Sequence, residues 1–142
     1  MNTQSFKSLL LAFLMGLFTL AALAVANPVM KQADDPLDKI ALAIQAGNAK
    51  ALAAYFDNTV EITIQNDEGV VYSKAQAEQV MKDFFTKNTP SSFKIMHKGS
   101  SVGNSMYGIG TMQTSKGGYR VNVFYKKNGA DYVIYKLKFT ND

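Results

Sequence analysis

The chain of 142 residues contains no cysteine. This absence excludes a disulfide framework and a lipid-modified N-terminal cysteine. It also leaves little for a zinc ion to bind, because the chain has only one histidine, His97. We therefore predict no metal and no cofactor, and a fold whose stability comes from its hydrophobic core alone.

Charge is scarce near the N-terminus, where residues 8–30 carry none. A largely apolar run covers residues 9–25, and Ala24-Val25-Ala26 has the small-x-small pattern that signal peptidase accepts. We predict a secretory signal peptide over residues 1–26, cleaved after Ala26, and hence an exported protein that is periplasmic or secreted. If it is not cleaved, the same stretch is long enough to anchor the chain in a membrane.

Capping residues and apolar spacing predict three helices. The first begins after Asp35, a typical N-cap that is followed by proline at the first helical position, and it ends at Gly47. The second covers residues 49–56. The third begins with a Ser-x-x-Gln capping box at Ser73 and covers residues 74–87.

Alternation of apolar and polar residues predicts the strands. A first strand over residues 60–65 turns at Asp-Glu-Gly into a brief partner over residues 70–72. Four consecutive antiparallel strands, joined by turns that contain glycine, follow over residues 93–101, 105–114, 119–127 and 132–140. Residues 27–34 are expected to form a disordered leader, and residues 35–142 a single α+β domain.

Two segments are distinctive: DPLDKIALAIQAGNAK, which begins at Asp35, and YSKAQAEQVMKDFF, which begins at Tyr72. Together with the order of the elements, they resemble a family of small exported bacterial proteins of unknown function. That family is similar to the nuclear transport factor 2-like, cystatin-like α+β fold. The resemblance implies a cone-like, curved antiparallel sheet of four long strands plus a short hairpin, packed on N-terminal helices and one long helix. It implies no function.

Alternation also predicts which side chains face the interior of such a sheet. The strand over residues 105–114 stays unassigned, because neither of its alternating sets is clearly apolar. The inward aromatic residues and those of the helices either line a small apolar pocket or, as the close packing of interiors favours, fill the core. The candidate pocket residues are Tyr55, Phe84, Phe93, His97, Tyr119 and Tyr135.

Carboxylates are missing from residues 84–130. Residues 27–83 carry five Lys or Arg and nine Asp or Glu, a net charge of −4, whereas residues 84–142 carry nine and two, a net charge of +7. The outward side chains predict a basic sheet face of Lys94, Lys98, Arg120, Lys126, Lys136 and Lys138. Such a face attracts anionic headgroups, acidic glycans or other polyanions, or it is a solvated lysine-rich face that keeps strand edges from pairing.

Catalytic candidates are few. His97 is the one candidate base, although a single inward histidine is more often a packed core residue. Relatives of this fold that are isomerases or dehydratases use a base inside the sheet. The strand acid Glu61 alternates with apolar residues and points away from that interior.

We therefore predict an exported non-catalytic binding or accessory domain that uses the aromatic pocket or the basic sheet face. The alternative is a small enzyme of isomerase or dehydratase type that acts on a hydrophobic small molecule with His97 as its base. The expected partners are a small hydrophobic ligand or an anionic surface. A homodimer through the sheet is a further candidate, and no nucleic acid is expected.

Overall fold

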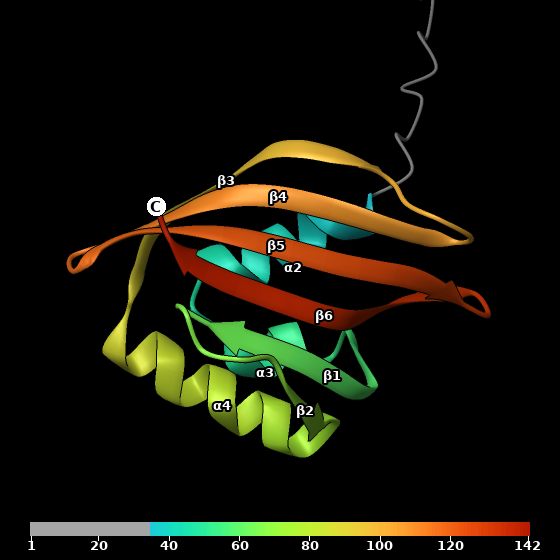
Figure 1. Ribbon diagram of the computed structural model, residues 1–142, viewed down its shortest axis with the longest axis horizontal. Helices are drawn as coiled ribbons and strands as arrows, with labels where there is room; N and C mark the ends of the chain where they lie inside the picture. Colours follow the sequence, from blue (N-terminus) through green and yellow to red (C-terminus); the bar gives the residue numbers. More distant parts are fainter. Residues whose placement is uncertain (1–34) are drawn as a thin grey trace, which may run out of the picture. The chain divides into compact units, whose positions relative to one another are not determined.

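The computed structural model describes residues 35–142, which form an α+β fold (Figure 1). Its helices are α2 (Pro36–Gln45), α3 (Ala49–Ala53) and α4 (Lys74–Lys87). Its strands are β1 (Phe56–Ile64), β2 (Val70–Ser73), β3 (Pro90–Ser100), β4 (Ser105–Thr114), β5 (Gly117–Asn128) and β6 (Asp131–Asn141). The predicted signal peptide and leader lie outside the described residues. Within residues 35–142, no helix is long and apolar enough to cross a membrane.

Local capping signals position the helices, as the sequence predicts. Asp35 caps α2, because its carboxylate accepts a hydrogen bond from the Leu37 backbone N–H at 3.0 Å. Ser73 and Gln76 form the capping box of α4, in which each side chain accepts a hydrogen bond from the other residue's backbone N–H. Both predicted helix starts are therefore confirmed.

The second helix is shorter than the sequence predicts. It ends at Ala53, and Phe56 already belongs to β1, although the helical pattern extends that far. The reason is a contact with the distant strand β6, because the Ile134 N–H donates to the Tyr55 carbonyl at 2.6 Å and Phe56 pairs with Ile134. Tertiary pairing here overrides a local helical preference.

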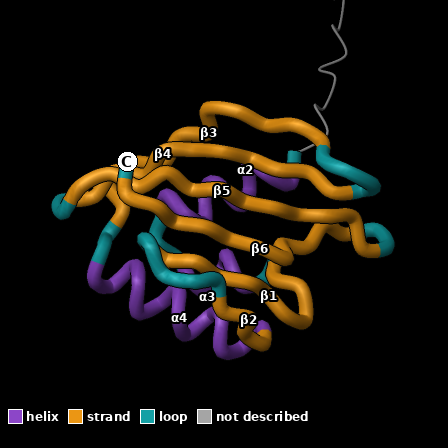
Figure 2. The backbone as a smooth tube through the Cα atoms, viewed as in Figure 1, coloured by secondary structure: helices purple, strands orange, loops and turns teal. Residues whose placement is uncertain are grey.

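The six strands form one sheet in the order β2-β1-β6-β5-β4-β3. All neighbours are antiparallel except β1 and β6, which run parallel and bring the first strand beside the last (Figure 1). The helices lie along one face of this sheet (Figure 2). We call the helix-covered face the inner face and the opposite one the outer face.

The inner face and the helices share one hydrophobic core. The fully buried Phe139 of β6 has the ring of Phe84 4.7 Å away, measured between ring centroids. Gly108 of β4 makes room for α2, because a Cβ there would lie 2.6 Å from the Leu37 side chain. Glycine at inward positions of β4 also explains why the sequence leaves the faces of this strand unassigned.

A β-bulge in β3 reverses two predicted side-chain directions. The register of β3 against β4 shifts between Ile95 and His97, which leaves Met96 as an extra residue. One extra residue reverses the alternation beyond it. The predicted inward direction of His97 is therefore wrong, since its side chain is exposed. Lys98, predicted for the basic sheet face, instead reaches toward α2.

A second irregularity moves Tyr135 to the outer face. Phe124 and Tyr125 of β5 pair with Lys136 and Ile134, so Tyr135 between them is the extra residue of β6. Ile134 is fully buried in its place. The predicted inward direction of Tyr135 is wrong for the same physical reason as that of His97.

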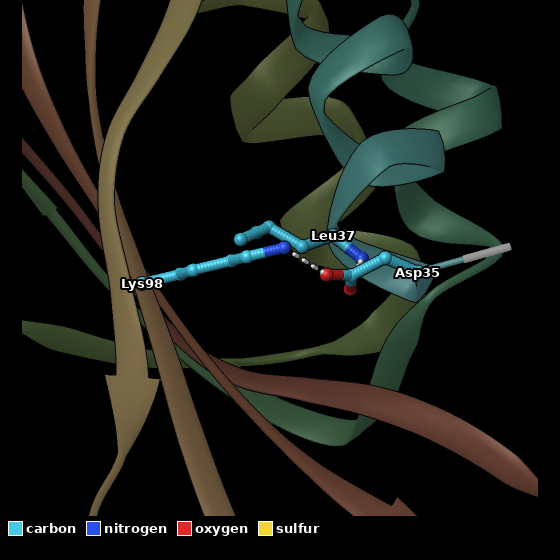
Figure 3. A network of polar contacts seen from close by, with 3 residues as sticks. All are labelled: Asp35, Leu37 and Lys98. Carbon is cyan, nitrogen blue, oxygen red and sulfur yellow. Dashed lines mark hydrogen bonds and ion pairs between the residues drawn. The ribbon is translucent and has the colours of Figure 1, made fainter. Parts of the chain in front are cut away.

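An ion pair joins the edge strand β3 to the first helix (Figure 3). Lys98 Nζ lies 2.7 Å from Asp35 Oδ2, while Asp35 Oδ1 caps α2. Burial raises the pKa of Asp35, but hydrogen bonds from Lys98 and from the Leu37 N–H, with the Lys98 charge, outweigh it and hold the pKa below 3.8. The ionised carboxylate therefore stabilises the fold above pH 3.8, and this stabilisation is lost as the pH falls through the lowered pKa.

We expect Asp35→Ala to lower the free energy of unfolding by about 1–2 kcal/mol, because it removes the helix cap and an exposed ion pair. Asp35→Asn is the matched control, since its amide oxygen still caps α2 and only the ion pair is lost. Urea unfolding at neutral pH should rank wild type above the asparagine variant and the alanine variant last. Below pH 3.8 the gap between wild type and Asp35→Asn should narrow, and a constant gap would contradict a role for the ionised carboxylate.

Candidate functional site

The outer face of the sheet combines cationic and aromatic side chains. The cross-strand register places them in neighbouring positions over β3, β4, β5 and β6. The titratable members are Lys94, His97, Arg120, Lys126, Lys136 and Lys138. The other large members are Tyr107, Ile109, Asn122, Phe124 and Tyr135. Together these residues form what we call the outer-face cluster.

Three cations of the cluster, Lys94, Arg120 and Lys138, have no counterion within residues 35–142. Lys94 and Arg120 are both paired with Thr111 of β4, which lies between them. Strand spacing therefore separates their Cα atoms by about 10 Å. Lys138 is the diagonal neighbour of Arg120 on β6, at about 8 Å.

Two other lysines of the cluster are neutralised. Lys126 Nζ lies 2.9 Å from Asp57, and Lys136 Nζ lies 3.0 Å from Glu61. The hydrogen bond from Lys126, together with one from the Asn58 N–H, holds the pKa of Asp57 below 3.8. The positive charge of the cluster that has no counterion in the described residues is therefore carried by Lys94, Arg120 and Lys138.

Aromatic rings lie among these cations. The rings of Phe124 and Tyr135 are 6.4 Å apart, and Lys126 Nζ lies 5.7 Å from the centre of the Tyr135 ring. Tyr107 lies over Gly99 of β3, because a Cβ at this glycine would be 2.8 Å from the tyrosine hydroxyl oxygen. All three rings are half-buried, so part of each is open to solvent.

Asn122 lies within the cluster, in register with Ile109 on β4 and Lys138 on β6. Its Oδ1 atom is buried and has no hydrogen-bond donor within the described part of the chain. A buried acceptor without a donor costs about 1–3 kcal/mol. Because neighbouring side chains cover this atom, a bound hydroxyl or amine group would reach it and remove that cost only after those side chains move.

Two of the six candidate pocket residues, Phe84 and Tyr119, pack against each other with ring centroids 5.4 Å apart, but the six do not gather at one place. Three of them are buried side chains of the core, namely Phe84, Phe93 and Tyr119. Tyr55 lies half-buried beside α3. The irregularities in β3 and β6 turn His97 and Tyr135 to the opposite face, so this set lines no common pocket.

Surface hollows lie on the helical side of the fold. One of about 600 Å³ is formed by α3, α4 and their neighbours, with Lys50 and Phe85 in its lining. One of about 590 Å³ lies beside Tyr55 and Tyr132.

Burial and the charge of Asp35 raise the pKa of the nearby core residue Tyr125 to about 12, so its hydroxyl keeps its proton at neutral pH. In residues 35–142, no three His, Asp or Glu side chains are placed to hold a metal ion.

Reasoning from the sequence identified five of the cations but missed the rings. Tyr107 and Ile109 belong to the strand whose faces it left unassigned. Phe124 belongs to the outward set of β5, and a large apolar residue at an outward position was the available signal. Asn122 has no sequence signal, because its unpaired oxygen depends on neighbours from two other strands.

Crystal structures of similar proteins support the fold. A DUF4783 family protein from Bacteroides uniformis is 30% identical, with a TM-score of 0.71 and coverage of 76% of this chain and 98% of that chain. One from Bacteroides ovatus is 31% identical, with a TM-score of 0.69 and coverage of 73% and 93%. A Nostoc punctiforme domain of unknown function with a cystatin-like fold is 12% identical over 75% of this chain and 72% of that chain, with a TM-score of 0.58, which shows the fold alone.

The family match covers most of the described residues. Residues 37–140 match DUF4783, a domain of unknown function, while no curated protein matches the chain. Similar structures also include two proteins with NTF2 in their names, 12% and 15% identical, which show the fold alone. The predicted resemblance and fold class are therefore confirmed, and the chain belongs to the DUF4783 family of unknown function, with an α+β fold similar to cystatin-like and NTF2-like folds.

Proposed function

We propose that the protein is an exported, non-catalytic binding domain that holds a polyanion against the outer face of its sheet. The observation that carries this proposal is the group of three cations without a counterion in the described part of the chain, Lys94, Arg120 and Lys138. They lie on a face where β3, β4 and β5 contribute no carboxylate. Export rests on the N-terminal segment, residues 1–26, which lies outside the described residues.

Protection of the sheet edge accounts for at most one of these three charges. Charged residues that prevent unwanted pairing are needed on edge strands. Lys94 is on the edge strand β3, but Arg120 and Lys138 are on β5 and β6, which have hydrogen-bonded neighbours on both sides. Two of the three cations therefore favour a role in binding.

A second copy of the chain is a less suitable occupant of this face. In a symmetric dimer the same patch of both copies meets. The unpaired cations of one copy would then face those of the other, and like charges brought together disfavour association. A negatively charged partner satisfies the same cations without this repulsion.

The enzyme alternative gains no support from the site. His97, its candidate base, is exposed on the outer side. In the described residues, no carboxylate accepts a hydrogen bond from its ring or forms an ion pair with it. A base that serves a hydrophobic substrate would need a sheltered place beside it.

Salt dependence tests the proposal on the unmodified protein. Poly-glutamate is the probe, because it is a polyanion with neither sugar rings nor bases. Three ionic contacts predict that the logarithm of affinity falls with the logarithm of salt concentration with a slope of about −2 to −3. Fluorescence anisotropy of labelled poly-glutamate measures this slope, and a slope near zero, or no binding at low salt, would contradict the proposal.

A further inference from the structure

We propose that the polyanion is an acidic polysaccharide, a polymer of sugar rings that carry carboxylates. This inference rests on the proposed function and names the partner class of the same face. Three features meet in the outer-face cluster: unpaired cations, half-buried aromatic rings, and a buried acceptor without a donor. Each feature sets a separate requirement for the chemistry of the ligand.

The cations require negative groups that repeat along the ligand. Standard strand spacing places the Cα atoms of Lys94 and Arg120 about 10 Å apart and those of Arg120 and Lys138 about 8 Å apart. A single small anion does not span all three positions. An extended polymer with a charge on each ring-sized unit can meet all three.

The aromatic rings require a flat apolar surface on the ligand. Tyr107 and Phe124 are directly opposite each other on β4 and β5, and Gly99 stands beside Tyr107 on the edge strand. The face of an aromatic ring carries negative potential. The C–H bonds on one face of a sugar ring point slightly positive hydrogens toward such a surface, so rings of the two kinds stack.

The amide of Asn122 requires a hydrogen-bond donor. Ionised carboxylates and phosphates only accept hydrogen bonds, whereas a hydroxyl group donates. A ligand made of anionic groups alone would satisfy the cations and leave Asn122 Oδ1 without a partner. Sugar hydroxyls beside the carboxylates of a polysaccharide can supply the missing donor once the side chains that cover Asn122 Oδ1 move aside.

An anionic membrane surface meets these requirements less well. Binding at a membrane interface is strengthened by apolar side chains that enter the acyl boundary. The strongly exposed apolar side chains of the described residues are Leu42, Val70, Val71, Met96 and Val102. Of these, Met96 adjoins the outer-face cluster beside His97, so the cluster presents one such side chain and not the apolar face that interfacial binding uses.

Single-stranded nucleic acid also offers anions, donors and flat rings. The N-terminal segment favours the polysaccharide, because an exported protein meets acidic glycans in the cell envelope and its surroundings. The two partner classes are separated by direct comparison in the same experiment.

Affinities for five probes test the inference: polygalacturonate, its methyl-esterified form, poly-glutamate, phosphatidylglycerol vesicles and oligodeoxythymidine. Polygalacturonate should bind more tightly than the three other anionic probes at equal charge concentration. Methyl esterification should abolish the binding at equal sugar concentration, because it removes the charges and keeps the rings. Phe124→Leu should weaken polygalacturonate binding about 3- to 10-fold, because it removes one stacking surface. The same variant should weaken poly-glutamate binding less than polygalacturonate binding, because poly-glutamate has no sugar ring to stack, and circular dichroism checks that the variant is folded.

The outcomes separate the inference from the proposed function. If poly-glutamate does not bind, both fail. If poly-glutamate binds, but poly-glutamate itself, vesicles or oligodeoxythymidine bind at least as tightly as polygalacturonate, the polysaccharide is overturned while polyanion binding stands. If Phe124→Leu lost the same factor of affinity for polygalacturonate as for poly-glutamate, the stacking contact would be overturned.

Discussion

Reversing three charges together, in a variant with Lys94→Glu, Arg120→Glu and Lys138→Glu, should lower the affinity for poly-glutamate more than about 100-fold. A cation close to an anionic partner contributes about 1 kcal/mol. Loss of three such contributions is about 3 kcal/mol, which corresponds to about a 100-fold change in affinity. The new carboxylates add repulsion to this loss. Fluorescence anisotropy at low salt measures the difference from wild type.

A matched control separates this site from net charge. Lys50, Lys82 and Lys87 are exposed on α3 and α4, on the other side of the sheet. Reversing these three changes the net charge of the chain by the same amount. The control variant should keep most of the wild-type affinity, and equal losses in the two variants would show that binding depends on total charge and not on the outer face.

Phe139→Ala should lower the free energy of unfolding by about 3–5 kcal/mol, the usual cost of removing a fully buried ring. Phe139 has no exposed surface, and its ring lies 4.7 Å from that of Phe84 and 6.5 Å from that of Phe85. Native domains have a total stability of only about 5–15 kcal/mol, so this variant should be near the limit of folding. Urea unfolding followed by circular dichroism measures the change.

Two controls show whether the interior is filled or holds a ligand pocket. Phe139→Leu keeps most of the apolar volume and should cost less than about 1.5 kcal/mol. Phe124→Ala removes the same ring from the half-buried outer face and should cost about 1 kcal/mol. If Phe139→Ala cost no more than Phe124→Ala, the ring of Phe139 would line an open space, and the closely packed core would be contradicted.

Features encoded in short segments were predictable from the sequence. The start of α4 follows from the reciprocal bonds of Ser73 and Gln76, which are three residues apart. The start of α2 follows from Asp35 and the proline after it. The strand predicted over residues 105–114 has the observed bounds of β4, because its turns contain glycine and asparagine. These signals need no knowledge of the rest of the fold.

Features that depend on strand pairing were not predictable in the same way. Met96 and Tyr135 are recognised as extra residues only from the register of pairing with the neighbouring strand. The parallel pairing of β1 with β6 joins segments far apart in the chain and has no local signal. The two extra residues change which side chains of β3 and β6 share a face, and the pairing of β1 with β6 decides which strands are neighbours.

The bulges explain why the observed faces of the sheet differ from the predicted ones. Strict alternation assigned His97 and Tyr135 to an inner pocket and Lys98 to the basic face. With one extra residue in each of two strands, the pocket loses two of its candidate residues and the outer face gains an imidazole and an aromatic ring. The basic face itself was predictable, because five of its six lysine and arginine residues lie on strand segments where alternation holds.

Lysine footprinting tests most directly whether a polyanion binds the outer face. The protein is acetylated with and without saturating poly-glutamate, and mass spectrometry measures the labelling of each lysine. Lys94 and Lys138 should become protected, whereas Lys50, Lys82 and Lys87 on the helical side should react equally in both samples. Protection confined to the helical lysines, or equal at all positions, would contradict binding at the outer face.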